Sequence, residues 1–291
     1  MPTASICAEL IEAGVDWLTV TCSDRKRGTT LAHLSDRLLA EEARAGNDRV
    51  RCSFLGYDGF SCGSIQSGVS HDAILLRLKS HLASKHWRRA YKLSDNVSRI
   101  DLMSTFRVPR PVPDLLHKFE KQALTFRSKQ NLEHDVYLHR SARKGITLNL
   151  NRRISDSFFR LYDKGAESKL REYENCLRIE GEFKKRRAAV VAATLLEHDA
   201  DGPASAASLH LALGRKGLRY HVPDGPVSGF PVPRTRSDTD RRLDWLAGSV
   251  AGTIKRLRAE GRLRDAVVAL GFSDEELLSL IKPPCEELKG G

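Results

Sequence analysis

The sequence lacks several features that mark well-known protein classes. Its six cysteines include no C-x-x-C pair and form no regular ladder, which argues against a zinc ribbon, a redox motif or a disulfide framework. No apolar run approaches the ~18 residues that a membrane-spanning helix needs. The N-terminus has no basic segment followed by an unbroken apolar stretch, as a signal peptide would. These absences predict a soluble, cytoplasmic protein with free thiols and no membrane partner.

Length and charge narrow the class further. A chain of 291 residues with 41% hydrophobic content can bury a full core, so one large domain or two smaller ones are expected. Its 48 Lys and Arg residues outnumber 37 Asp and Glu residues, giving a net charge of +11. Each basic side chain placed on a phosphate releases counterions, so this excess favours nucleic acid as a partner. Solubility alone is the alternative explanation of the charge.

Predicted strands and helices alternate over the first two thirds of the chain. Alternating and β-branched patterns predict strands over residues 15–21, 99–108, 145–151, 158–164 and 177–183. Apolar spacings of three and four predict helices over residues 31–44, 114–126 and 186–198. The segment 72–90 fits either a helix or a strand that runs into a helix. This order predicts an α+β fold, an antiparallel sheet with helices packed on one face.

Composition divides the chain into three regions. Residues 1–198 hold the alternating elements and form the predicted catalytic domain. Residues 199–237 are rich in Gly, Pro, Ser and Ala, which predicts a loose connector or a partly ordered extension. Residues 238–291 return to helical spacing and predict a C-terminal helical extension. The apolar faces of these last helices are a basis for expecting a homodimer.

The segment from Phe158 to Lys184 carries the most informative polar pattern. It predicts two strands joined by a polar connection, with polar side chains on one face because successive residues alternate across a strand. The first strand places Arg160, Tyr162 and Lys164 on that face, and the second places Arg178, Glu180 and Glu182 there. A phenol, cations and paired carboxylates on one face predict phosphoryl transfer with a tyrosine nucleophile and a divalent metal.

Asp101 lies on a third strand and adds its carboxylate to this face if the strands are neighbours. Aspartate is depleted in strands, so its presence there needs a reason. Hard oxygen ligands such as Asp101, Glu180 and Glu182 suit Mg²⁺ or Mn²⁺, and a metal there would polarise a phosphodiester. Cross-strand ion pairs between arginine and glutamate explain the same residues without catalysis.

Tyr162 is a poor nucleophile at its ordinary pKa of ~10 and needs cations nearby. Arg160 and Lys164 are predicted to supply that field and to hold the phosphate. Glu167 either orients Lys164 or adds a metal ligand. Half-buried packing of the tyrosine ring is the competing explanation.

Two basic segments are predicted to contact DNA. The segment KHWRRAYK (residues 85–92) combines Arg88 and Arg89 with two aromatic rings that could stack on unpaired bases, although a solvated helix face explains it equally well. The run KKRR directly follows the second carboxylate strand and is placed to clamp DNA through Lys184, Lys185, Arg186 and Arg187.

The segments FFRLYDKGAES and LRIEGEFKK, with SRIDLMSTF upstream, resemble the replication initiation factor family. This family comprises initiators of the Rep_trans type from rolling-circle plasmids and filamentous phages, and it is related to relaxases of integrative elements. GVDWLTVT and GITLNLN match its usual layout. The resemblance covers roughly residues 14–195 and leaves the C-terminal region uncovered.

The resemblance implies a site- and strand-specific DNA endonuclease and ligase that acts at a replication origin in a bacterial cell. Tyr162 matches the family's nucleophile, which keeps the 5′-phosphate as a phosphotyrosine and leaves a 3′-OH primer. Asp101 and Glu180 match carboxylates near the metal, with Glu182 as a third candidate. Arg178 and Lys184 match basic positions that contact DNA. A host helicase is a further partner that the resemblance brings in.

Two departures bear on this expectation. Thr105 stands where relatives commonly carry a second acidic residue, so either that carboxylate is dispensable or the metal site is thinner. The chain also has no His-x-His pair, which separates it from the initiators that hold metal with histidines. A non-nicking origin-binding regulator and a mobilisation relaxase are therefore the alternative functions.

Overall fold

The computed structural model describes residues 9–70, 73–130, 135–141, 145–197 and 201–218, together with Gly261. The chain divides into two compact units, Met1–Pro231 and Val232–Gly291. The described residues other than Gly261 all belong to the first unit. The predicted C-terminal helical extension, with any dimer contact through it, therefore lies outside the described residues.

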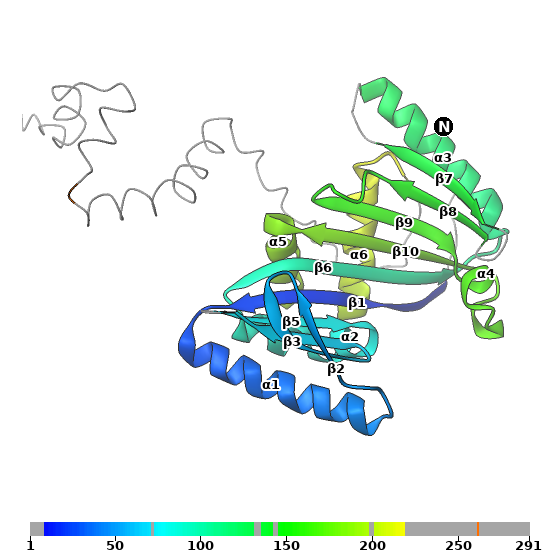
Figure 1. Ribbon diagram of the computed structural model, residues 1–291. Helices are drawn as coiled ribbons and strands as arrows, with labels where there is room; N and C mark the ends of the chain where they lie inside the picture. Colours follow the sequence, from blue (N-terminus) through cyan, green and yellow to red (C-terminus); the bar gives the residue numbers. More distant parts are fainter. Residues whose placement is uncertain are drawn as a thin grey trace, which may run out of the picture. The chain divides into compact units, whose positions relative to one another are not determined.

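The first unit is built on a ten-stranded antiparallel sheet (Figure 1). The strand order is β2-β3-β4-β5-β1-β6-β10-β9-β8-β7, so β1, β6 and β10 lie near its centre. The strands are β1 (Glu9–Cys22), β2 (Val50–Phe54), β3 (Tyr57–Cys62), β4 (Ile65–Val69), β5 (Ile74–Lys79), β6 (Asn96–Arg107), β7 (Val136–Ser141), β8 (Gly145–Leu150), β9 (Ser157–Asp163) and β10 (Cys176–Lys184). The ambiguous segment around residues 72–90 proves to be a strand followed directly by a helix.

The long helices pack on one face of this sheet and leave the other face open. They are α1 (Arg25–Arg44), α2 (Ser80–Leu93), α3 (Val112–Gln130), α5 (Lys185–Leu196) and α6 (Asp201–Gly214). Two short elements, α4 (Lys164–Ser168) and the 3₁₀ turn η1 (Arg171–Tyr173), connect β9 to β10. The predicted α+β fold, an antiparallel sheet with helices packed on one face, is confirmed.

The alternation of side chains along β6 shows why the two faces differ. Ile100 and Leu102 are fully buried under the helices, whereas Asp101 and Met103 point to the open face and are partly exposed. Trp87 of α2 and Phe119 of α3 fill the same core. Each such fully buried apolar side chain contributes about 1.5–3 kcal/mol to the stability of the fold. The buried residues therefore fix the register of the strands, and with it the positions of the polar side chains on the other face.

Helix α6 occupies the first part of the segment 199–237, for which a loose connector or a partly ordered extension is predicted; residues 219–237 lie outside the described residues. Its small residues allow close packing, and Ala206, Leu209 and Leu213 are fully buried against the sheet. Gly181 in β10 provides the matching flat surface, since a Cβ there would lie 2.5 Å from Cδ2 of Leu209. The alanine and serine residues that suggested a linker in the sequence belong to α6, where their small side chains let the helix pack closely on the sheet. None of the helices in the described part is long and apolar enough to cross a membrane.

Candidate active site

The register of β6, β10 and β9 places the predicted site residues on the open face of the sheet. These strands are neighbours, which is the condition on which the predicted site depends, and they pair in antiparallel fashion. Glu182 lies opposite Asp101, and Arg178 lies opposite Tyr162. Because in-register partners point to the same side, these side chains share one surface.

Tyr162 donates a hydrogen bond from its hydroxyl to Oε1 of Glu180 over 2.6 Å. The side chain lies in the sheet surface and is only 8% exposed. Burial raises the pKa of Tyr162 strongly, the charge of Glu180 raises it further, and the charge of Arg178 opposes the shift. The phenol is therefore held in its protonated form as a hydrogen-bond donor.

Glu180 is the acceptor at the centre of the site. Its Oε2 accepts hydrogen bonds from Nε of Arg160, at 2.9 Å, and from Nη2 of the same guanidinium. Burial opposes ionisation of Glu180, but the charge of Arg160 and the hydrogen bonds from Tyr162 and Arg160 outweigh it and lower the pKa. Glu180 is thus a carboxylate in direct contact with the phenolic proton.

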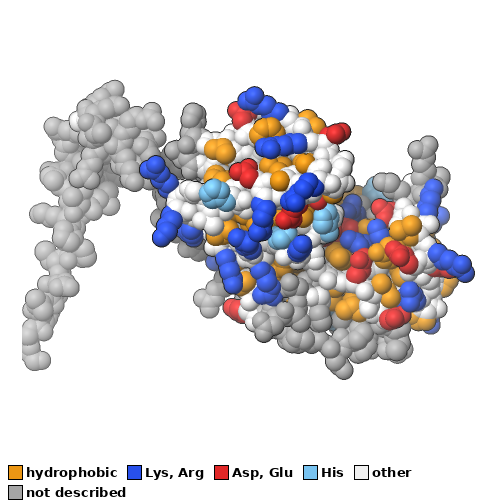
Figure 2. Space-filling model, turned by 90° about the horizontal axis from the view of Figure 1, so that it is seen from below, with side chains coloured by type: hydrophobic (Ala, Val, Ile, Leu, Met, Phe, Trp, Pro, Cys, Tyr) orange, Lys and Arg blue, Asp and Glu red, His pale blue; other side chains and the backbone are white. Residues whose placement is uncertain are grey.

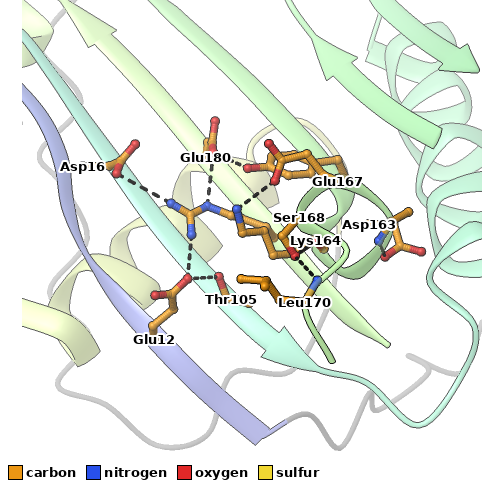
Figure 3. Close-up of polar contacts among 12 residues, drawn as sticks. Glu12, Asp16, Thr105, Asp163, Lys164, Glu167, Ser168, Leu170 and Glu180 are labelled. Carbon is orange, nitrogen blue, oxygen red and sulfur yellow. Dashed lines mark hydrogen bonds and ion pairs between the residues drawn. The ribbon is translucent and has the colours of Figure 1, made fainter. Parts of the chain in front are cut away.

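Arg178, which the resemblance assigns to DNA contact, is buried and lies near three carboxylates. These are Glu12, Asp16 and Glu180, which Figure 3 labels. Its Nη1 lies 2.6 Å from Oε1 of Glu12, its Nη2 lies 3.6 Å from Oδ1 of Asp16, and its Nε lies 3.1 Å from Oε1 of Glu180. Arg178 is the cation with the largest effect in favour of ionisation of Tyr162, a role predicted for Arg160 and Lys164; Arg160 also interacts with Tyr162 through its charge.

Glu12 places a carboxylate beside Thr105, the position at which the resemblance leads one to expect a second acidic residue. The two residues lie opposite each other in β1 and β6, and the Thr105 hydroxyl donates to Oε1 of Glu12 over 2.9 Å. A carboxylate therefore reaches this point of the site from the neighbouring strand. Sequence reasoning missed Glu12 and Asp16; an aspartate inside the strand pattern VDWLTVT was the available signal, because strands rarely carry one.

Asp101 and Glu182 form a second acidic pair, held by shared cations. Arg99 binds Asp101 through Nε–Oδ1 at 2.8 Å and Nη2–Oδ2 at 2.5 Å, and its Nη2 lies 3.0 Å from Oε2 of Glu182. Lys184 adds an ion pair to Glu182 at 2.7 Å. Burial raises the pKa of Asp101 to about 6 although Arg99 opposes the shift, and the charges of Glu182 and Asp16 add to it.

The carboxylate pair Asp101–Glu182 has the donor chemistry that a divalent cation needs. Mg²⁺ usually takes one or two protein carboxylates and completes its shell with water and substrate phosphate. Glu180, the third predicted ligand, is engaged by Tyr162 and Arg160, just as Asp101 and Glu182 are engaged by Arg99 and Lys184. Over the ranges that the structure describes, no three His, Cys, Asp or Glu side chains gather as a metal site. The register thus unites two of the three predicted ligands.

Lys164 lies at the start of α4 rather than on the strand. Its Nζ is 2.8 Å from Oε2 of Glu167 and 5.5 Å from the ring centroid of Tyr173. Of the two roles considered for Glu167, this ion pair fits the orientation of Lys164. Arg160 keeps its predicted place beside Tyr162, with its guanidinium carbon 5.6 Å from the ring centroid.

The basic run after β10 lies at the junction with α5. Lys184 bonds the carbonyl of Arg153 in addition to Glu182, and Lys185 pairs with Asp156 at 3.0 Å. Arg187 donates to the Ser157 hydroxyl over 3.3 Å, and Arg186 is exposed. Of these four predicted DNA contacts, Arg186 is the one that forms no hydrogen bond or ion pair with the described residues.

The segment KHWRRAYK is helical in α2 and differs from the prediction in one respect. Trp87 is 1% exposed because it lies on the apolar face of the helix, so its ring is not available for stacking on bases. Arg88 donates to the carbonyls of Leu195 and Leu196 at the end of α5, each over 3.4 Å. Arg89 is exposed. Figure 2 shows that Lys and Arg side chains gather on the side of the molecule where α1 lies.

Comparison with known proteins leaves the family of the chain open. No family model matches the sequence, and no curated protein matches it. Among solved structures, the rolling circle replication initiator protein from Geobacillus stearothermophilus aligns with a TM-score of 0.44 and 15% identity, over 81% of this chain and 95% of that one.

Proposed function

We propose that this protein is a DNA-nicking and DNA-joining enzyme of the rolling-circle initiator kind, with Tyr162 as nucleophile. The observation that carries the proposal is the 2.6 Å hydrogen bond from the Tyr162 hydroxyl to Glu180, on an open sheet face between Arg160 and Arg178. A phenol, a carboxylate acceptor and arginines are the parts that transfer of a phosphoryl group to tyrosine requires. The resemblance of the strand pair β9–β10 to the replication initiation factor family supports the same reaction.

The proposed step balances as a transesterification. The Tyr162 oxygen forms a bond to phosphorus while the bond from phosphorus to the 3′-oxygen breaks. Glu180 takes the phenolic proton along the existing hydrogen bond, and the 3′-oxygen leaves as a hydroxyl after gaining a proton from solvent water. The 5′-phosphate remains on Tyr162, and reversal by a 3′-OH rejoins the strand. Arg160 is placed to hold the phosphate charge.

Mg²⁺ or Mn²⁺ belongs to the proposal as a cofactor. Asp101 and Glu182 would hold it, with Glu180 as a third candidate. When bound, such an ion polarises the phosphodiester and stabilises charge on the leaving oxygen. Binding of Mn²⁺ measured by calorimetry should weaken in Asp101→Asn and Glu182→Gln, whether or not the preparation nicks DNA.

A DNA-binding protein without nicking activity is the second candidate. Tyr162 is buried and its pKa is raised by burial and by Glu180, so the phenol is a weak nucleophile unless Glu180 accepts its proton during the reaction. A mobilisation relaxase would use the same chemistry as the initiator and differs only in its biological setting.

Supercoiled plasmid carrying the DNA that flanks the gene provides the substrate for the test. Wild-type protein with Mn²⁺ or Mg²⁺ should yield open circles and a covalent protein–DNA adduct that denaturation does not separate. Tyr162→Phe should abolish both products. Tyr137→Phe is the matched control, because Tyr137 is an exposed tyrosine on β7. Binding without any nicking or adduct in the wild-type protein would establish the second candidate and overturn the first.

A further inference from the structure

A cluster of three cations surrounds Trp17 on the open face of the sheet, away from Tyr162. Trp17 in β1 lies opposite Lys79 in β5, and Thr19 lies opposite both Arg77 and Arg99. Measured to the Trp17 ring centroid, Arg99 lies at 4.4 Å, Lys79 at 5.1 Å and Arg77 at 5.5 Å. The ring therefore gathers positive charge by cation–π attraction.

Two of these cations have no carboxylate partner among the residues that the structure describes. Arg99 is paired with Asp101 and Glu182, but within the described ranges neither Lys79 nor Arg77 has a carboxylate at ion-pair distance. Arg77 donates from Nη1 to Oε1 of Gln66 over 2.6 Å, whereas its buried Nε has no partner among the described residues. Burial of unpaired cations costs free energy that a bound anion would recover.

The neighbouring charges agree with this geometry. Burial lowers the pKa of Lys79 and the charge of Arg77 lowers it further; burial likewise lowers the pKa of Arg77, and the charge of Arg99 adds to that shift. The dominant charges acting on Lys79 and Arg77 are therefore other cations. Arg77 also lies 5.5 Å from the ring centroid of Phe54, so its guanidinium sits between two aromatic side chains.

We infer that Lys79, Arg77 and Trp17 form a binding site for the backbone of single-stranded DNA on the open face of the sheet. The inference rests on the proposed function, which brings a DNA strand to this face. Cations interleaved with aromatic rings are the usual means of holding a single strand, because phosphates bind the cations while unpaired bases find a π-face. A duplex, with its bases stacked inside, would use the cations alone.

The position of this cluster gives the strand a path to Tyr162. From β5 the sheet passes through β1, β6 and β10 to β9, which are four strand spacings, or about 19 Å at about 4.8 Å each. Tyr162 lies opposite Arg178, four residues along β10 from Glu182, which adds about 13 Å in the direction of the strands. Asp101 and Glu182 lie between the two sites, in the row that contains Trp17. DNA bound at Lys79 would thus approach the Tyr162–Glu180 pair across the carboxylate pair.

Binding of a labelled oligo(dT) by fluorescence anisotropy tests the inference, in the Tyr162→Phe background so that no adduct forms. Lys79→Gln should weaken binding about threefold to tenfold and reduce the slope of log affinity against log salt by about 0.7 for one lost phosphate contact. Trp17→Leu should weaken it at least about fivefold. Lys26→Gln, the same charge change at an exposed position of α1, should leave the affinity within about twofold.

Tryptophan fluorescence gives a second measurement that does not depend on a destabilised variant. The chain has three tryptophans, so the measurement uses a Trp245→Phe background. Quenching by oligo(dT) should be largely lost when Trp17→Phe is added, since Trp87 is buried. Equal affinity of Lys79→Gln and Lys26→Gln would overturn the inference. Equal weakening of duplex or polyglutamate binding by Lys79→Gln would overturn the assignment to a single strand.

The same experiments separate this inference from the proposed function. A wild-type protein that binds oligo(dT) through Lys79 but never forms an adduct would refute the nicking proposal and leave the binding site standing. Normal nicking by the wild-type protein, together with unchanged oligo(dT) binding in Lys79→Gln, would refute the binding site and leave the nicking proposal standing.

Discussion

The hydroxyl of Tyr162 and Oε1 of Glu180 lie 2.6 Å apart, joined across two neighbouring antiparallel strands. The same carboxylate oxygen is 3.1 Å from Nε of Arg178. Glu180 therefore couples the phenol to a buried arginine whose other nitrogens bind Glu12 and lie near Asp16. A change at any of these residues alters the charge that Tyr162 experiences.

Replacement of Glu180 by glutamine removes both a proton acceptor and a negative charge. The pKa of Tyr162 should fall, because the charge of Glu180 contributes to its elevation. Nicking should nevertheless drop by about 10²–10⁴-fold, the usual contribution of general base catalysis. Ultraviolet titration of the variant against Glu180→Gln/Tyr162→Phe measures the first effect, and adduct formation measures the second. Wild-type nicking rates in Glu180→Gln would exclude Glu180 as the proton acceptor.

Removal of Arg178 leaves three acidic side chains facing one another without their cation. Arg178→Met should lower the free energy of unfolding by roughly 3–5 kcal/mol, as expected when one partner of a buried ion network is lost. Urea denaturation measures the loss. Arg37→Met on α1 is the control; it breaks an exposed pair with Glu41 and should cost less than about 1 kcal/mol. A loss in Arg178→Met as small as in the control would contradict the assignment.

Because Glu12 and Thr105 are in contact, we expect a carboxylate at position 105 to be able to replace the carboxylate at position 12. Thr105→Asp alone should destabilise the protein, because it sets a second carboxylate beside Glu12 in a buried position. Combination with Glu12→Gln should recover most of the lost stability, since one carboxylate rather than two then occupies this position beside Arg178. A double-mutant cycle in urea should show coupling of about 1 kcal/mol or more. Simple additivity of the two changes would argue against the shared position.

The pKa of Asp101 predicts a specific pH dependence of stability. Its folded value of about 6 lies above the unfolded value of 3.8, so the folded state holds the proton more tightly. The stabilisation is complete below about pH 4 and is lost as the pH rises through about 6, amounting to roughly 3 kcal/mol at most. Asp101→Asn should remove this slope from the curve of unfolding free energy against pH.

Asp36→Asn, an exposed carboxylate change on α1, should leave that curve parallel to the wild-type curve. Should Asp101→Asn also run parallel to the wild type between pH 4 and 6.5, the raised pKa of Asp101 would be wrong.

The alternation of polar and apolar residues was sufficient to predict the central strands and their faces. Asp101, Tyr162 and Glu180 could each be assigned to the polar face of its own strand because side-chain direction in a strand follows from residue parity. Their meeting on one surface depended on the strands being neighbours, which parity does not predict. The partners of these residues could not be predicted in this way. Glu12 and Asp16 reach the site only through the pairing of β1 with β6, and β1 carries register shifts within that pairing.

The role of Arg178 was hidden from the sequence for a related reason. A basic residue next to carboxylates on a strand is compatible with DNA contact and with ion pairing, and only burial decides between them. Helix α6 was missed because small residues serve both linkers and close helix packing. Its place is fixed by Gly181, whose meaning depends on the element packed above it.

The flat surface at Gly181 has a consequence for the design of shortened proteins. Glu180 and Glu182 flank this glycine, so the strand that carries them is supported from behind by Leu209. A protein cut after residue 198, where the sequence places a domain boundary, would expose apolar surface on β1, β6 and β10 to water. Such a fragment should aggregate or be digested quickly by trypsin, whereas one that retains α6 should keep a protease-resistant core.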